Sequence, residues 1–206
     1  MNLSDNTVEG SLKGPPYQQR SFVFFMNKKT KEKLLILCEC GITVALGLAL
    51  CPLEIDFAWL QGGGLDILMV PIVILALRRG GGWGIATGAL FGLLKYLLWS
   101  SGGYGIPSIL LDYVLAYAAV GTAGFFKKPI PGTAVATGVR FLIHFISGVT
   151  IYAITASETV YGITTASPFI YSVVYNAPYV LVNGIVCAVI VVLLEKPMAK
   201  IPKSFK

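Results

Sequence analysis

Residues 170–194 read IYSVVYNAPYVLVNGIVCAVIVVLL, and this stretch contains no charged side chain. As an α-helix rising about 1.5 Å per residue it is long enough to cross a bilayer, which requires about 20 apolar residues. The mean hydropathy of the whole chain is +0.75. Only 13% of its 206 residues are charged, against about 25% in soluble domains. The alternating pattern of membrane β-barrels is absent, so the sequence predicts an all-α integral membrane protein.

Five further apolar runs precede this stretch. Together they give six predicted transmembrane helices, at residues 34–52, 65–77, 83–99, 106–126, 133–155 and 170–194. The sequence therefore predicts a single transmembrane domain over residues 34–195. A polar and basic segment, residues 1–33, precedes this domain, and a basic tail, residues 196–206, follows it.

Charged residues alternate along the chain between the two predicted sides of the membrane. One set of connections carries clusters of Lys and Arg, at residues 28–33, 78–79, 127–128 and 196–206. The other connections are neutral or carry the acidic residues Glu54, Asp56, Asp66 and Glu158. Because cytoplasmic loops carry the excess of Lys and Arg, both termini are predicted to be cytoplasmic in a multi-pass protein of the cell membrane. The net charge of +6 then reflects topology, and we expect the lipid bilayer as a partner and no nucleic acid.

Two ionisable side chains lie inside predicted spans, where such groups are costly and mark functional sites. Asp112 is about six residues from the outer end of its span, a depth of about 9 Å. His144, the single histidine, is about eleven residues from the outer end of the next span, a depth of about 16 Å. Gly148 and Tyr152 follow His144 at intervals of four residues and share its helix face.

The last span enters the membrane from the outer side with Tyr171, Tyr175 and Asn176 in its first two turns. Three consecutive spans thus place a carboxylate, an imidazole, several tyrosines and an amide in the outer half of the bundle. A carboxylate beside aromatic rings favours a flat cationic ligand, and Asn and His provide directional hydrogen bonds. The sequence therefore predicts a binding site for a small heteroaromatic cation.

Each of these residues also has an ordinary explanation that the sequence leaves open. Asp112 could pair with Lys95 or cap a helix kink, and His144 could be a hydrogen-bonded histidine of the helix core. Tyr171 could belong to the aromatic belt at the membrane interface. Arg140, one turn before His144, is expected to extend its side chain toward the cytoplasm.

Motifs for catalysis, metal binding and ATP binding are absent from the sequence. No serine lies in a nucleophile elbow, and neither an HExxH helix nor a GxxxxGK[ST] loop occurs. The four cysteines, Cys38, Cys40, Cys51 and Cys187, are interpreted as small packing residues. We therefore expect no catalytic residues, no metal and no cofactor, and uphill transport would need a partner or an ion gradient as its energy source.

Small residues recur at intervals of four in two of the predicted helices. Gly84, Gly88 and Gly92 lie in the third, and Ala45 and Ala49 lie in the first. Such patterns let helices approach closely. The glycines are interpreted as packing residues inside the bundle.

An ordered set of short motifs resembles the thiamine-specific substrate-binding (S) components of energy-coupling factor (ECF) transporters. These motifs are QGGG at residues 61–64, MVPI at 69–72, ALRRG at 76–80, LDYVLAY at 111–117, GTAG at 121–124, RF at 140–141, HFISG at 144–148 and YSVVYN at 171–176. The resemblance implies a six-helix S component that binds thiamine with high affinity near the extracellular side.

The resemblance also implies roles for individual residues. The family's ligand-binding positions match Asp112, His144, Tyr152, Tyr171 and Asn176. Its AxxxA docking surface for the coupling transmembrane subunit matches Ala45 and Ala49. Two ATPase subunits complete the complex that the resemblance implies, and ATP hydrolysis there would drive uptake.

Three alternatives remain open from the sequence. The first is an S component for another small vitamin or precursor, such as riboflavin or a thiazole. The second is an intramembrane enzyme that uses Asp112 and His144. The third is a purely structural subunit with no ligand pocket.

Overall fold

The computed structural model of the chain describes residues 27–55, 64–99, 105–155 and 159–202, apart from the side chains of 152–155 and 160. Most of the predicted N-terminal segment therefore lies outside the described residues. The elements are α1 (Lys28–Leu50), η2 (Cys51–Leu53), α2 (Met69–Arg79), α3 (Gly81–Trp99), α4 (Ile106–Ser108), the π-helix η3 (Ile109–Leu115), α5 (Ala116–Val120), η4 (Gly121–Phe125), α6 (Pro129–Thr155), the strands β1 (Thr159–Val160) and β2 (Ile163–Thr164), and α7 (Pro168–Ala199).

Four helical segments of the described chain are long and apolar enough to cross a membrane. They are Lys28–Leu53, Ile106–Phe125, Pro129–Ile151 and Pro168–Ala199. The predicted helical membrane fold agrees with this result. α2 has 11 residues, which is about 16 Å of helix and shorter than a hydrocarbon core. The count of six spans and the cytoplasmic position of the termini therefore stay predictions.

Capping residues explain why two helices begin earlier than the hydropathy pattern indicates. α1 begins at Lys28 because the side chain of Asn27 accepts a hydrogen bond from the backbone N–H of Lys29 at 3.3 Å. α7 begins at Pro168, after Ser167, whose hydroxyl accepts from the N–H of Ile170 at 3.5 Å. Proline is favourable at the first helical position, where its missing N–H costs nothing.

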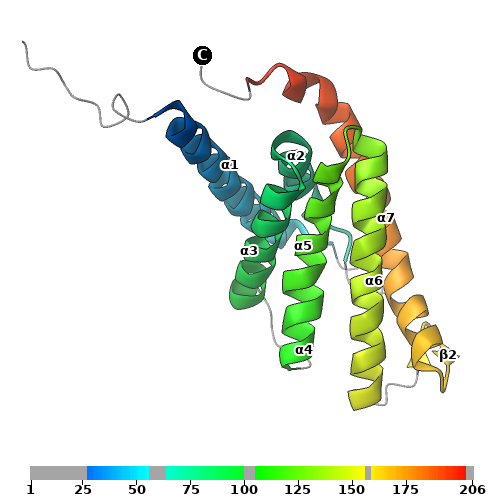
Figure 1. The fold of residues 1–206 in the computed structure, drawn as a ribbon. Helices are drawn as coiled ribbons and strands as arrows, with labels where there is room; N and C mark the ends of the chain where they lie inside the picture. The colour runs from blue at the N-terminus through cyan, green and yellow to red at the C-terminus, as the bar shows by residue number, and fades with distance from the viewer. Residues whose placement is uncertain (1–26, 56–63, 100–104, 156–158, 203–206) are drawn as a thin grey trace, which may run out of the picture.

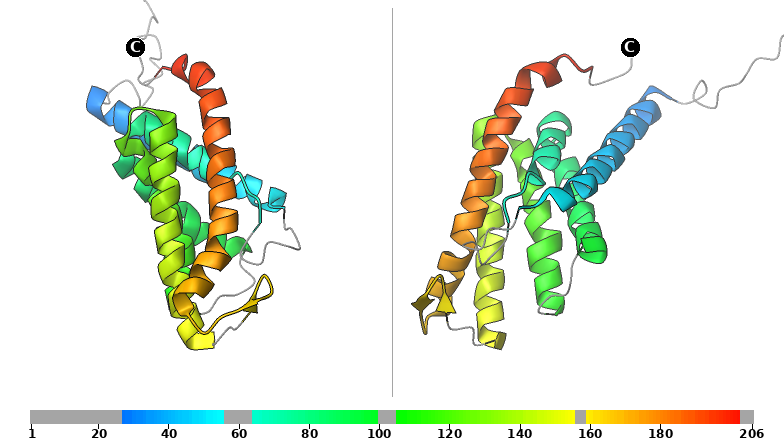
Figure 2. Two further views of the ribbon diagram at one scale, coloured as in Figure 1. Left: turned by 90° about the vertical axis from the view of Figure 1, so that its right-hand side faces the viewer. Right: turned by 180° about the vertical axis from the view of Figure 1, so that it is seen from behind.

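The helices form a bundle in which α6 and α7 lie side by side along most of their length (Figure 1). α3 packs against the continuous helix formed by α4, η3, α5 and η4. α1 leaves the bundle at an angle, and its first turn lies at the same end of the molecule as the last turns of α7 (Figure 2). A two-stranded hairpin, β1–β2, connects α6 to α7 and pairs Thr159 with Thr164.

Glycines allow the close approach of α3 to η3 and α5. A Cβ atom at Gly88 would lie 2.8 Å from the carbonyl carbon of Tyr117, and one at Gly92 would lie 2.7 Å from that of Tyr113. Real Cβ atoms do not come this close to backbone, so only glycine fits at either position. The interpretation of these glycines as packing residues is confirmed.

The surface of the bundle is apolar where a bilayer would contact it. Leu142 on α6 is 57% exposed and Ile185 on α7 is 65% exposed. Several polar side chains are buried instead, among them Arg140, His144, Ser147, Ser172, Asn176 and Asn183. This inversion, with polar groups inside and apolar groups outside, is what a lipid environment requires of a bundle that encloses a polar site.

A polar cavity built on Asp112 and His144

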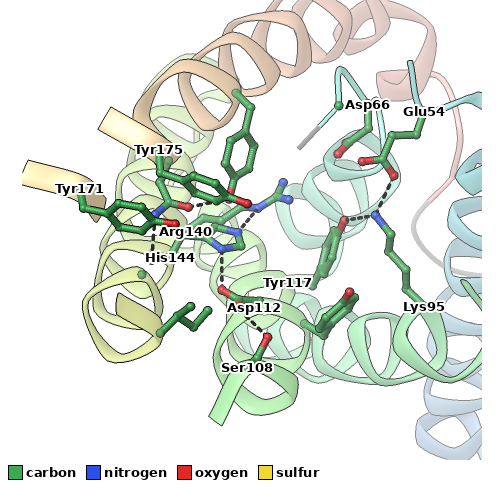
Figure 3. Close-up of a pocket in the computed structure, with 16 residues that line it drawn as sticks. Glu54, Asp66, Lys95, Ser108, Asp112, Tyr117, Arg140, His144, Tyr171 and Tyr175 are labelled. Carbon is green, nitrogen blue, oxygen red and sulfur yellow. Dashed lines mark hydrogen bonds and ion pairs between the residues drawn. The ribbon is translucent and has the colours of Figure 1, made fainter. Parts of the chain in front are cut away.

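A cavity of about 290 Å³ opens between the helices, and it is lined by charged and aromatic side chains (Figure 3). Its lining residues come from α3, α4, η3, α5, α6, α7 and the chain between α1 and α2. They are Glu54, Gly64, Asp66, Lys95, Ser108, Asp112, Tyr113, Tyr117, Arg140, His144, Gly148, Ile151, Tyr171, Tyr175, Asn176 and Tyr179.

Asp112 is held in the cavity wall by three side chains. One carboxylate oxygen lies 3.1 Å from Nδ1 of His144, and the other accepts hydrogen bonds from the hydroxyls of Ser108 at 2.8 Å and Ser147 at 2.7 Å. The carboxylate belongs to the π-helix η3, a wide helical turn that occurs frequently at functional sites. The predicted proximity of Asp112 and His144 is therefore present, although the two residues are 32 positions apart.

Asn176 joins α7 to α6 beside His144. Its Nδ2 donates to the carbonyl oxygens of Ser172 at 2.9 Å and His144 at 3.2 Å, and its Oδ1 accepts from the Tyr179 hydroxyl at 2.9 Å. The Tyr179 ring also meets the His144 imidazole edge to face, with 5.7 Å between ring centroids. Asn176 thus links the two helices at the cavity wall, and its Oδ1 can accept one further hydrogen bond.

Two of the three predicted aromatic residues can be placed at the cavity with their side chains. Tyr171 and Tyr175 both line it, and their rings stack with 5.7 Å between centroids and an interplanar angle of 15°. Tyr171 is 7% exposed, so it is buried rather than placed as an interfacial belt residue would be. The backbone of Tyr152 belongs to α6, but its side chain lies outside the described residues.

Arg140 differs from its prediction and is a cavity residue that sequence reasoning missed. Its side chain is 4% exposed and lies over the ring of Tyr117, 4.7 Å from the centroid, so the predicted extension toward the cytoplasm is wrong. Its Nε donates to Nε2 of His144 at 3.4 Å. Its Nη1 is buried with no hydrogen-bond partner among the described residues. The spacing of four residues to His144 was the available signal, because it places both side chains on one helix face.

Lys95 and Glu54 are further cavity residues that the sequence did not mark as part of a site. Lys95 Nζ lies 3.1 Å from a carboxylate oxygen of Glu54 and donates to the hydroxyl of Tyr117 at 3.2 Å. Lys95 therefore does not pair with Asp112, which was one of the open alternatives. Asp112 pairs with His144 instead.

Asp66 anchors the chain that precedes α2 to the middle of α7. Its carboxylate accepts from the N–H of Leu68 at 2.9 Å and from the amide of Asn183 at 3.3 Å, and its own N–H donates to Asn183 Oδ1 at 3.1 Å. Asp66 is 6% exposed. The sequence does not indicate this pairing, because Asn183 lies 117 positions away. From the sequence alone, Asp66 therefore looks like a charged residue of an outer loop.

The lining of the cavity carries one more acidic than basic group. Glu54, Asp66 and Asp112 contribute three carboxylates, and Lys95 and Arg140 contribute two cations. With His144 counted as neutral, the formal charge of the lining is −1. Asp112 and Asp66 both lack a lysine or arginine among their described hydrogen-bond partners, and Asp112 is bonded to two hydroxyls and the imidazole. The cavity is therefore suited to a ligand with a single positive charge.

The arrangement of Ser147, Asp112 and His144 is not that of a nucleophilic triad. In a triad the histidine accepts the proton of the serine hydroxyl, and the carboxylate orients the histidine. Among the described residues, the hydroxyls of Ser108 and Ser147 both donate to Asp112, and neither reaches His144. The described residues also hold no group of three or more His, Cys, Asp or Glu side chains that could bind a metal ion.

The predicted docking residues lie away from the cavity, on α1. Ala45 and Ala49 are both exposed, while Val44 and Gly47 of the same helix are buried against the bundle. The two alanines and the exposed Ile42 and Leu46 form an apolar face, here called the α1 outer face.

Comparisons with known proteins agree with the fold and with the motifs. The model of the family described as thiamine transporter protein (Thia_YuaJ) matches residues 37–203. The thiamine transporter ThiT of Bacillus subtilis (strain 168) is 31% identical over 157 residues, which cover 71% of this chain and 82% of the relative. The thiamine transporter ThiT of Lacticaseibacillus paracasei is 25% identical over 199 residues, which cover 84% of this chain and 96% of the relative.

A solved structure has the same fold. ThiT from Listeria monocytogenes superimposes with a TM-score of 0.70 and 22% sequence identity, over 82% of this chain and 97% of that one. The family match extends over the described cavity and nearly the whole chain that follows α1. The resemblance inferred from the motifs is thereby confirmed, and the chain belongs to the thiamine transporter protein (Thia_YuaJ) family.

Proposed function

We propose that this chain binds thiamine in the cavity beside Asp112 and acts in thiamine uptake as the S component of an ATP-driven ECF transporter. The observation that carries the proposal is the carboxylate of Asp112, which has no lysine or arginine among its described hydrogen-bond partners and lies in a polar cavity of a thiamine transporter family member. Thiamine carries one permanent positive charge on its thiazolium ring, which matches the formal charge of −1 on the lining. The binding would occur with high affinity and from the extracellular side.

The size and the lining of the cavity support a small aromatic ligand. Ligand pockets commonly measure about 300–1,000 Å³, and this cavity of about 290 Å³ is close to the lower limit of that range. Tyr171 and Tyr175 present stacked rings at one side of it (Figure 3). Aromatic faces attract cations and stack on flat rings. Both properties suit the thiazolium and aminopyrimidine rings of thiamine.

Each predicted residue has a specific role in this proposal. Asp112 is the charge partner of the ligand, and His144 and Asn176 supply hydrogen bonds that orient its rings. Tyr171 makes a polar contact, and Tyr152 offers a stacking face from α6. The buried Nη1 of Arg140 adds a donor for a ring nitrogen of the pyrimidine, since it has no partner among the described residues.

Transport requires partners that this chain would contact through α1. We propose that the α1 outer face, with Ala45 and Ala49 at its centre, docks on a coupling transmembrane subunit. The exposure of both alanines is consistent with a surface reserved for a neighbouring helix. Two ATPase subunits would provide the energy, because this chain has no P-loop.

Tryptophan fluorescence of the purified protein tests the ligand assignment. Trp83 and Trp99 lie at the two ends of α3, and Trp59 lies outside the described residues. Saturable quenching by thiamine, with none from riboflavin beyond its own absorbance, is the expected result. A response to riboflavin or a thiazole alone would transfer the assignment to another vitamin, and chemical conversion of bound thiamine would point to an enzyme instead.

Gly148 provides a first prediction for the site. A Cβ at this position would lie 2.9 Å from Asn176 Nδ2 and closer still to the Ser172 hydroxyl. Gly148→Ala should therefore displace Asn176 and weaken thiamine binding about tenfold, or about 1.4 kcal/mol, as measured by calorimetric titration. Gly138→Ala is the matched control, because a Cβ at Gly138, on the same helix, would have no atom within 4 Å. Equal affinities in the two variants would show that ligand binding does not depend on the position of Asn176.

A further inference from the structure

The ion pair between Lys95 and Glu54 occupies the side of the cavity opposite the stacked tyrosines (Figure 3). Its atoms lie 3.1 Å apart, and the side chains of Lys95 and Glu54 are 14% and 28% exposed. Lys95 also donates to Tyr117 and lies over the ring of that tyrosine, 5.6 Å from its centroid. Both charged residues therefore line the ligand space, and Lys95 is more shielded from solvent than Glu54.

The other charges of the lining are arranged differently. Asp66 accepts hydrogen bonds from the backbone N–H of Leu68 and from Asn183. Arg140 lies over the ring of Tyr117 and donates a hydrogen bond to His144. Lys95 and Glu54 alone form a direct pair of a full cation and a full anion among the described lining residues. The pair is neutral as a unit, so the formal charge of −1 on the lining comes from Asp66, Asp112 and Arg140.

We infer that Lys95 and Glu54 balance each other's charge in the cavity lining, so that the loss of either one alone changes the ligand charge that the cavity prefers. This inference rests on the proposed function, since it assumes that thiamine occupies the cavity. Charges interact over several ångströms when water is scarce between them. A balanced pair therefore contributes little to the field at the ligand, whereas either residue alone contributes a full charge.

The two single substitutions should have opposite effects. Lys95→Met leaves Glu54 without its cation and gives the lining a formal charge of −2, which strengthens the preference for a cationic ligand. Glu54→Gln leaves Lys95 without its anion and gives a formal charge of 0, which weakens that preference. The double variant carries neither charge and returns the lining to −1.

The experiment compares thiamine with a neutral analogue in which carbon replaces the quaternary ring nitrogen. For each variant the ratio of the dissociation constant of the analogue to that of thiamine measures charge discrimination. The ratio should rise at least about fivefold in Lys95→Met, fall at least about fivefold in Glu54→Gln, and stay within about twofold of the wild-type value in the double variant. Lys127→Met, which removes an exposed lysine just before α6, is the control and should leave the ratio unchanged.

A purely structural role for the pair predicts a different outcome. Loss of packing would weaken both ligands by the same factor, and unchanged ratios in both single variants would overturn the inference while the proposed function stands. If Lys95→Met does not yield monodisperse protein, Glu54→Gln and the double variant decide the question, since they predict distinct ratios. Absence of thiamine binding to the wild-type protein would overturn the proposed function and this inference together.

Discussion

Asp112→Asn should weaken thiamine binding by at least about tenfold, or about 1.4 kcal/mol, with the fold intact. The substitution keeps the size of the side chain and an oxygen that can accept from Ser108 or Ser147. It removes the one carboxylate of the lining that pairs with a histidine and has no lysine or arginine among its described contacts. The ligand cation would then enter a cavity of formal charge 0, and calorimetric titration of the purified variant measures the loss.

Glu195→Gln is the matched control for this prediction. Glu195 also carries a carboxylate in a long apolar helix, but it lies near the end of α7 and outside the cavity lining. Loss of this carboxylate in Glu195→Gln should leave the dissociation constant for thiamine within about twofold of the wild-type value. Unchanged affinity in Asp112→Asn would exclude Asp112 as the charge partner and would remove the main support for the site.

Ala45→Trp should abolish thiamine uptake in cells while leaving thiamine binding to the purified protein intact. The indole would project from the α1 outer face and keep a partner helix from the close approach that small residues permit. Ala45 is exposed and contributes nothing to the cavity lining. The measurement pairs uptake of labelled thiamine with titration of the isolated variant.

Ile185→Trp serves as the control for docking. Ile185 is 65% exposed on α7, so a tryptophan there also adds bulk to the outside of the bundle. Uptake should continue in this variant, because α7 is not part of the α1 outer face. Equal loss of uptake and binding in Ala45→Trp would mean that the substitution disturbs the fold rather than a docking surface.

Hydropathy predicted the helical segments, although the number that cross a membrane stays a prediction, and local capping determined where two of them begin. The apolar run at residues 170–194 lies within α7, but Ser167 and Pro168 start that helix earlier. Lys28 belongs to α1 because Asn27 caps it, although the lysines around it suggest a polar segment. An average of hydropathy over a window does not detect such caps, because each cap depends on a single side-chain hydrogen bond.

The sequence indicated those residues of the candidate site whose ionisable side chains lie deep inside a predicted membrane span. Asp112 and His144 are costly at their positions unless something pairs with them, and they pair with each other. Arg140 was misassigned because a long side chain near a basic end usually extends to water. Here the ring of Tyr117 and the nitrogen of His144 hold it inside.

Lys95, Glu54 and Asp66 were beyond sequence reasoning for a different reason. Each lies near the end of a predicted span, where a charge is normal and signals topology. Their burial depends on contacts between distant segments, such as Glu54 with Lys95 and Asp66 with Asn183. Only the packing of the helices shows that these residues face inward.

A structure of this chain determined with thiamine bound in lipid nanodiscs tests the central claim most directly. The account predicts ligand density in the cavity between η3, α6 and α7, with the thiazolium or aminopyrimidine ring within contact distance of the Asp112 carboxylate. Density for thiamine at any other place, with Asp112 still bonded only to Ser108, Ser147 and His144, would contradict it.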